Sequence, residues 1–199
     1  MDLTQGTQEE KRARAKKTML WFGIGSLIMS FSALISAFIV SSKQRRDKDW
    51  LSNYELPDAF FISVGIILLS SLTFILAKRA LKLKNRQMTT IWLLTTLALG
   101  LAFVFSQFVG FGQIIEAGHY FTGPTSNITM SYIYVIAGLH IGHVIVGLIC
   151  IIVVIYNHFK QKYNSNNMLG LELAANFWHF VDLLWLVLFL FLYFFSDRI

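Results

Sequence analysis

Two pairs of ionisable residues lie inside strongly apolar stretches of the sequence, where they could bind a metal or carry protons. His140 and His143 are three residues apart, so on a helix their imidazoles share one face and can bind a metal ion or a haem iron. His179 and Asp182 have the same spacing, and a carboxylate within hydrocarbon is a usual component of a proton relay. Each pair also has a structural interpretation, as polar groups that form hydrogen bonds between packed helices.

Neither chemistry finds a complete set of groups in the sequence. A metal site normally needs more than two ligands, and the other candidates inside the apolar stretches are His179, Asp182 and Cys150. A proton relay needs titratable groups from one membrane face to the other, and the first three apolar stretches supply neutral polar residues such as Gln107. We therefore favour structural contacts for both pairs, and we expect no metal or haem in this chain.

The stretch that carries His179 and Asp182 is long enough to form a membrane-spanning helix. Glu172, Asn176, His179 and Asp182 follow steps of four, three and three residues, which places them along one stripe of a helix with 3.6 residues per turn. An ionisable side chain in hydrocarbon costs at least ~2.5 kcal/mol on insertion scales. We therefore expect this stripe to face other helices.

The composition is that of an integral membrane protein. The chain has 199 residues, of which 55% are hydrophobic, contains two prolines and has a positive mean hydropathy. Five windows can cross a ~30 Å hydrocarbon layer, and they cover residues 18–40, 57–77, 89–111, 131–156 and 173–195. The sequence predicts an all-α bundle of five transmembrane helices over residues 18–199, preceded by a polar cytoplasmic arm over residues 1–17. Short connections predict that consecutive helices are antiparallel neighbours.

The distribution of basic residues predicts the topology. Twelve of the 17 Lys and Arg residues lie in the N-terminal tail and in the connections after the second and fourth spans. Such loops tend to stay in the cytoplasm, so the N-terminus is expected inside and the C-terminus outside. The net charge of +6 is explained by basic residues that meet anionic lipid at the span ends, which argues against a nucleic-acid partner. His158 and Lys160 are candidate contacts for lipid headgroups.

Small and aromatic residues mark candidate packing positions. Gly138 and Gly142 form a small-xxx-small pair that allows another backbone to approach closely, and Gly147 follows on the same span. Trp178 and Trp185 are seven residues apart in the last span. We expect all five positions to take part in helix packing.

A pairing between His143 and Asp182 is the most specific structural expectation. If the fourth span starts near Ser131 on the outside, His143 is about 18 Å down at ~1.5 Å per residue. Asp182 lies about 12 to 14 Å up from the inner end of the last span, so the two depths nearly coincide in a ~30 Å layer. Antiparallel neighbours then bring the imidazole to the carboxylate, and His140 and His179 extend the network.

The motifs resemble one family, subunit III of the haem-copper terminal oxidases, which includes cytochrome c oxidases and quinol oxidases. The resemblance rests on GLHIGHVIVG from Gly138 to Gly147, on Ser165-Asn166 and Gly170-Leu-Glu172, on FWHFVDLLW from Phe177 to Trp185, and on Gln107 within FSQF. It covers roughly Leu56 to Phe195. It implies that Gln107, His140, His143, Glu172, His179 and Asp182 are the buried polar residues of the family motif.

The resemblance also implies a function. The chain would be a five-helix bacterial form that lacks the first two helices of seven-helix members and holds no haem or copper of its own. Its expected partners are the catalytic subunit I and the copper-binding subunit II, which hold the haem and copper, together with bound phospholipid in the inner (plasma) membrane. A larger respiratory supercomplex is a further candidate partner. The complex would pump protons and reduce oxygen to water.

The sequence departs from the family at two acidic positions. The stretch from Ile28 to Leu34 lacks the membrane-embedded glutamate that is common there, and Gly110 stands at another position that is often acidic. Roles of those carboxylates in proton uptake therefore do not carry over. Two alternatives to an oxidase subunit stay open at this point, an accessory subunit of a nitric oxide reductase and an independent membrane transporter or metal enzyme.

Overall fold

The computed structural model describes residues 7–45, 56–123, 126–163 and 168–196. These residues form five α-helices and no strand: α1 (Gln8–Arg45), α2 (Asp58–Lys82), α3 (Arg86–Glu116), α4 (Ile128–Phe159) and α5 (Leu169–Ser196). All five are long and apolar enough to cross a membrane. The prediction of an all-helical, five-span membrane protein is confirmed.

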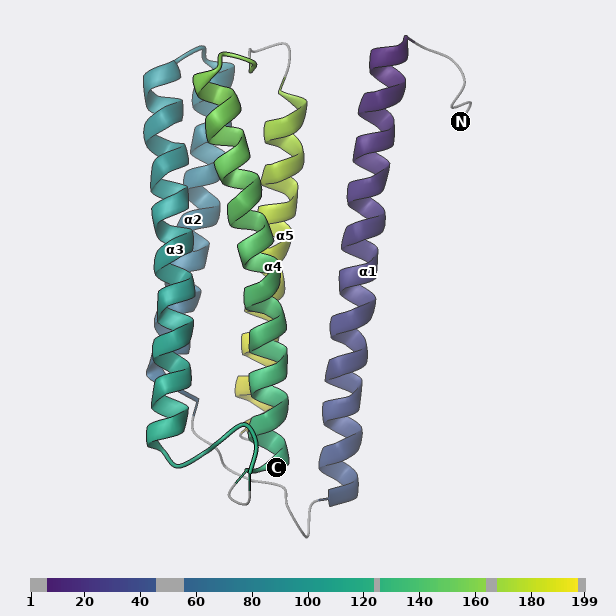
Figure 1. Cartoon of the computed structure of the whole chain (residues 1–199), viewed down its shortest axis with the longest axis vertical. Coiled ribbons are helices and arrows are strands. Elements are labelled where there is room, and N and C mark those ends of the chain that lie inside the picture. The colour runs from purple at the N-terminus through teal and green to yellow at the C-terminus, as the bar shows by residue number, and fades with distance from the viewer. Residues whose placement is uncertain (1–6, 46–55, 124–125, 164–167, 197–199) are drawn as a thin grey trace.

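Helices α2 to α5 form a four-helix bundle, and α1 lies alongside it (Figure 1). In the bundle α2 packs on α3 and α5, and α4 packs on α3 and α5. We call the end of the molecule at which α1, α3 and α5 begin and α2 and α4 end the N-side. The neighbours in the bundle are antiparallel, as the short connections predicted.

The position of α1 corrects one expectation, because α1 packs on α4 and α5 and makes no contact with α2 among the described residues. The connection from Arg45 to Asp58 is longer than any other between helices, so it does not force its two helices together. The aromatic residues of α1 determine its neighbours instead. Phe38 meets Tyr132 of α4 and Phe191 of α5 with ring centroids 5.6 and 5.5 Å apart.

Helix α1 begins at Gln8, well before the expected start of the first span at Thr18. Thr7 and Glu10 form a capping box: the Thr7 amide donates to Glu10 Oε2 (3.1 Å), and the Glu10 amide donates to Thr7 Oγ1 (3.4 Å). Glu9 and Glu10 also place negative charge in the first turn, where the helix dipole favours it. The described part of the predicted polar arm is therefore a helical extension of the first span.

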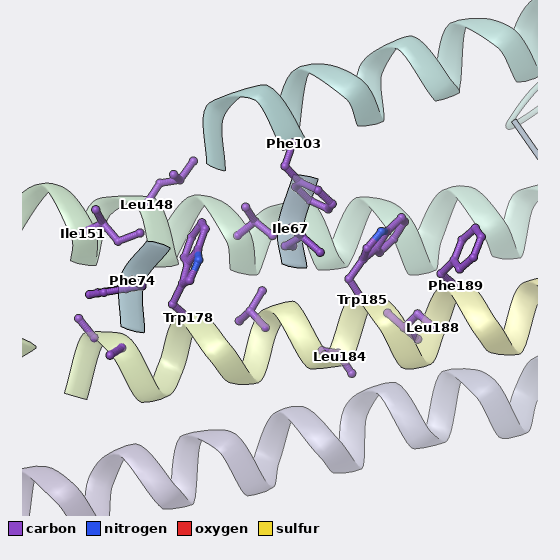
Figure 2. Packing of buried hydrophobic residues seen from close by; sticks show 14 of the residues in the cluster. Ile67, Phe74, Phe103, Leu148, Ile151, Trp178, Leu184, Trp185, Leu188 and Phe189 are labelled. Carbon is purple, nitrogen blue, oxygen red and sulfur yellow. The ribbon is translucent and has the colours of Figure 1, made fainter. Parts of the chain in front are cut away.

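The core of the bundle lies between α5 and the three helices around it (Figure 2). Trp178 and Trp185 are among the largest fully buried side chains, together with Phe60, Phe74 and Phe103. The Trp185 ring meets Phe60 and Phe103 edge to face, with centroids 5.5 and 5.6 Å apart. In a membrane, where lipid tails are as apolar as the core, such close packing is a main source of helix association.

Candidate functional site

Two tryptophans of α5 bond to two serines of α2 in the same register. Trp178 Nε1 donates to Ser70 Oγ and Trp185 Nε1 donates to Ser63 Oγ, each over 3.0 Å. The partners are seven residues, or about two turns, apart on both helices, so one antiparallel arrangement of α2 and α5 brings both pairs into contact. Ser63 and Ser70 were not among the residues predicted from the sequence. The matching seven-residue spacing of serine on one span and tryptophan on another was the available signal.

A second row of polar contacts runs beside the first. Ser71 Oγ and His179 Nδ1 are 2.7 Å apart, and seven residues closer to the N-side Lys78 Nζ lies 3.8 Å from Glu172 Oε1. Lys78 and Glu172 are partly exposed, with 31% and 33% of their side chains accessible. This row runs from the N-side surface of the chain toward the interior of the α2 and α5 interface.

Asp182 lies at the inner end of this row. The residue is 3% exposed and follows His179 by almost one helical turn. Ser71 of α2 lies near its carboxyl group, and neither carboxyl oxygen has a hydrogen-bond partner among the described residues. The expected stripe is interrupted at Asn176, which is exposed.

The two histidines of α4 point to different neighbours. His140 is fully buried, donates from Nε2 to the Val181 carbonyl over 3.1 Å, and lies 4.9 Å from the Trp185 ring. His143 is half-buried, donates from Nδ1 to the Leu139 carbonyl of its own helix over 2.7 Å, and meets Phe31 of α1 edge to face. The two rings do not converge on a common point. Within the described ranges no three His, Cys, Asp or Glu residues gather as a metal site would require.

The predicted pairing of His143 with Asp182 is therefore wrong. His140, and not His143, reaches α5 beside Asp182, at the Val181 carbonyl. The rotation of α4 about its axis differs from the expected one, since His143 faces Phe31 of α1. Residue spacing gives position along a helix axis, while rotation depends on how whole faces pack.

The glycines of α3 and α4 differ sharply in their surroundings. A Cβ on Gly147 would lie 2.8 Å from Trp178 Cε3, and a Cβ on Gly100 of α3 would lie 2.8 Å from Trp178 Cη2. These two glycines form a slot for the Trp178 ring. A Cβ on Gly138 or Gly142 would meet nothing within 4 Å. The expectation that Gly138 and Gly142 pack against another helix is not met within this chain, because that face of α4 points outward.

Helix α3 contributes Gln107 and Gly110. Gln107 is fully buried, and its amide has no hydrogen-bond partner in the described part of the chain. A Cβ on Gly110 would lie 2.5 Å from Phe60 Cε1, so this position has no room for an acidic side chain unless Phe60 moves. The Phe60 ring of α2 thus occupies the space that an acidic side chain at position 110 would need.

His158 and Lys160 differ in accessibility at the N-side end of α4. His158 is 4% exposed, and its Nε2 lies 3.0 Å from Thr90 Oγ1 of α3. Its ring lies inside the protein, where it contacts α3, which is contrary to the expected headgroup contact. Lys160 is exposed, and its Nζ lies 4.5 Å from the centre of the Tyr156 ring.

Comparison with known proteins finds relatives that match most of the chain. Residues 51–197 match the family model described as "Cytochrome c oxidase subunit III". Cytochrome c oxidase subunit 3 of Alkalihalophilus pseudofirmus is 32% identical over 177 residues, which cover 87% of this chain and 83% of the relative. Cytochrome bo(3) ubiquinol oxidase subunit 3 of Buchnera aphidicola is 32% identical over 178 residues, which cover 88% and 89%. A probable cytochrome c oxidase subunit 3 of Rickettsia conorii is 35% identical over 149 residues, which cover 74% and 50%.

The matched region agrees with the part of the sequence in which the motifs were found, and it contains α2 to α5 with the contacts that these four helices make with one another. The relatives include subunits of both a cytochrome c oxidase and a quinol oxidase. The chain belongs to the cytochrome c oxidase subunit III family.

Proposed function

We propose that this chain is a structural subunit without redox centres in a proton-pumping haem-copper oxidase that reduces oxygen to water. One observation carries the proposal: His140, Trp178 and His179 of the motifs on α4 and α5 form contacts between helices. Trp178 and His179 bond to serines of α2, and His140 bonds to the α5 backbone. The expected partners are the catalytic subunit I and the copper-binding subunit II in the bacterial inner membrane. The relatives named above are oxidase subunits, which favours this function over a nitric oxide reductase.

The hydrogen bonds of His140 and His143 support the proposal that haem and copper are bound by the partner subunits and not by this chain. His140 and His143 each donate from one ring nitrogen to a backbone carbonyl, and their rings face different helices. We expect a complex purified without this chain to keep its haem and copper content but to lose activity during turnover. Metal analysis, haem spectra and progress curves of oxygen consumption measure this, with the complex from a strain that regains the gene as control. Immediate and complete loss of activity in a complex that retains its haems would contradict the proposal.

We propose that the N-side is cytoplasmic, as the distribution of basic residues indicates. The prediction uses a variant in which Cys150→Ala removes the native thiol and a single cysteine replaces either Lys82 or Gly118, both of which are exposed. Because these residues lie at opposite ends of the bundle, a membrane-impermeant maleimide should label position 118 in intact cells and position 82 after permeabilisation. Labelling of both positions from the same side would reject this topology.

A hollow at the N-side supports the expected binding of phospholipid. It has a volume of about 660 Å³ and lies between α1, the end of α2 and the start of α5, where Arg12, Lys16, Lys17 and Lys82 face Glu9, Glu10 and Glu172. We expect Lys16→Glu with Lys17→Glu to reduce the anionic lipid that remains bound in native mass spectrometry of the full chain. Lys84→Glu, on an exposed residue outside the hollow, is the control. Equal lipid retention in both variants would argue against a headgroup site here.

A further inference from the structure

Asp182 is a buried acid, and no neighbouring group among the described residues compensates its charge. Both carboxyl oxygens are inaccessible and lack a hydrogen-bond partner among the described residues. The residue lies in a helix that continues without another Asp, Glu, His, Lys or Arg through residue 196. An ionised carboxylate in such a place costs several kcal/mol, whereas the neutral acid avoids most of this cost. The geometry thus favours a carboxyl group that holds a proton.

In the described part of the chain, the helices packed against α5 supply no cation to Asp182. From α4, His140 reaches the neighbouring Val181 carbonyl and His143 faces α1. The contacts of α1 with α5 include the aromatic rings of Phe38 and Phe191. From α2, Ser71 lies near the carboxyl group, and the nearest charged groups of the polar row are Lys78 and Glu172, which pair with each other.

The polar row runs from the level of Asp182 toward the N-side surface. Ser71 Oγ lies 2.7 Å from His179 Nδ1, a distance typical of a short hydrogen bond. Lys78 and Glu172 come seven residues later on α2 and seven earlier on α5, which is about 10 Å along the helix axes. About a third of each of these two side chains is exposed, so the row is open to solvent at this end.

We propose that Asp182 is an intramembrane proton-binding site that exchanges its proton with the N-side through Ser71 and His179. In the loading step, His179 Nε2 takes up a proton from water on the Lys78 and Glu172 side, and the Nδ1 proton passes to Ser71 Oγ. The Ser71 hydroxyl rotates and gives its own proton to the Asp182 carboxylate. One proton enters and one is bound, and His179 ends in its other neutral tautomer. Unloading reverses these transfers.

The row ends at Asp182, so the site stores a proton and does not conduct it across the membrane. Beyond Asp182, residues 183–196 of α5 contain no Asp, Glu, His, Lys or Arg. The stretch of α2 between Asp58 and Ser71 contains none of these residue types either. On that side the interface continues with the Trp185 and Ser63 bond and its aromatic neighbours. This inference is independent of the proposed oxidase function, because the full chain alone in a lipid bilayer tests it.

Infrared spectroscopy of the full chain in lipid nanodiscs tests the proton on Asp182. We expect a carbonyl band of a protonated carboxyl group at neutral pH that shifts when aspartate is labelled with ¹³C at its carboxyl carbon. This isotope shift requires no mutation, so it remains informative if Asp182→Asn fails to fold. Where Asp182→Asn folds, the band should disappear. A wild-type spectrum without this band would show that Asp182 is ionised and would overturn the proposal.

Exchange into D₂O tests the route through His179. His179→Phe and Ser71→Ala should each slow the deuterium shift of the Asp182 band by about a hundredfold or more, because they remove a positioned proton-transfer group. His143→Phe, on a half-buried histidine that faces α1, should leave the exchange rate unchanged. Equal exchange rates in wild type, His179→Phe and Ser71→Ala would overturn the proposed route.

Discussion

Replacing Trp178 with Ala is expected to destabilise the chain by about 3 to 5 kcal/mol, which is the usual cost of removing a large aromatic side chain from a core. The Trp178 ring lies between Gly100 of α3 and Gly147 of α4, and its Nε1 donates to Ser70 of α2. One side chain of α5 therefore contacts all three other helices of the bundle. Its loss leaves a cavity where the four helices meet and removes the hydrogen bond from the indole to Ser70.

Reversible unfolding of the full chain in mixed micelles, followed by circular dichroism, measures this effect. Trp21→Ala is the matched control, because Trp21 lies on α1 with 64% of its surface exposed and should change stability by less than about 0.5 kcal/mol. Ser70→Ala separates the hydrogen bond from the packing and should cost about 0.6 kcal/mol, the mean for such bonds in membranes. Equal stabilities of the Trp178→Ala and Trp21→Ala variants would contradict this assignment of the core.

The features that the sequence predicted correctly are those that depend on length and position along a helix. Apolar length predicts five segments that are long enough to span a membrane. They are predicted to be helices because a backbone in hydrocarbon must satisfy its own hydrogen bonds. Counting residues predicted that a histidine of α4 meets α5 near Asp182, and His140 does so at Val181, although the prediction named His143. The family followed from a combination of motifs over α3, α4 and α5, and the matched region confirms it.

The features that it missed depend on rotation and on choice of neighbour. Counting places His143 at the level of Asp182 but does not say that His143 faces Phe31 of α1. The same rotation of α4 turns Gly138 and Gly142 outward and brings Gly147 to Trp178. A stripe of small residues looks alike in sequence whether it meets a helix of the same chain or lies on the outer surface.

The serines of the candidate site could not be predicted for a different reason. Ser63 and Ser70 are common residue types in membrane helices, because a hydroxyl group can bond to its own backbone there, as Ser63 does to the Phe60 carbonyl over 2.7 Å. Their second role as acceptors for Trp185 and Trp178 requires two helices in antiparallel alignment. A single sequence gives no direct information about that alignment.

The rotation of α4 leads to the second large effect, a contrast between two glycines of one helix. Gly147→Ala should destabilise the chain by about 1 to 3 kcal/mol, the usual range for overpacking, because the new Cβ would lie 2.8 Å from Trp178 Cε3. Gly142→Ala adds the same methyl group five residues earlier, where nothing lies within 4 Å. It should leave the isolated chain equally stable or improve it by up to about 1 kcal/mol, since Ala favours helix more than Gly.

The same unfolding assay measures both variants, and their difference cancels the change in helix propensity because each replaces Gly by Ala within α4. If the two variants have the same stability, Trp178 does not occupy the slot and the rotation of α4 is wrong. Assembly of the oxidase complex adds a further readout, because the outward face of Gly142 is free within this chain. A Gly142→Ala chain that is stable alone but fails to assemble would identify that face as a contact with a partner subunit. Gly147→Ala should instead lower both the stability of the isolated chain and its assembly into the complex.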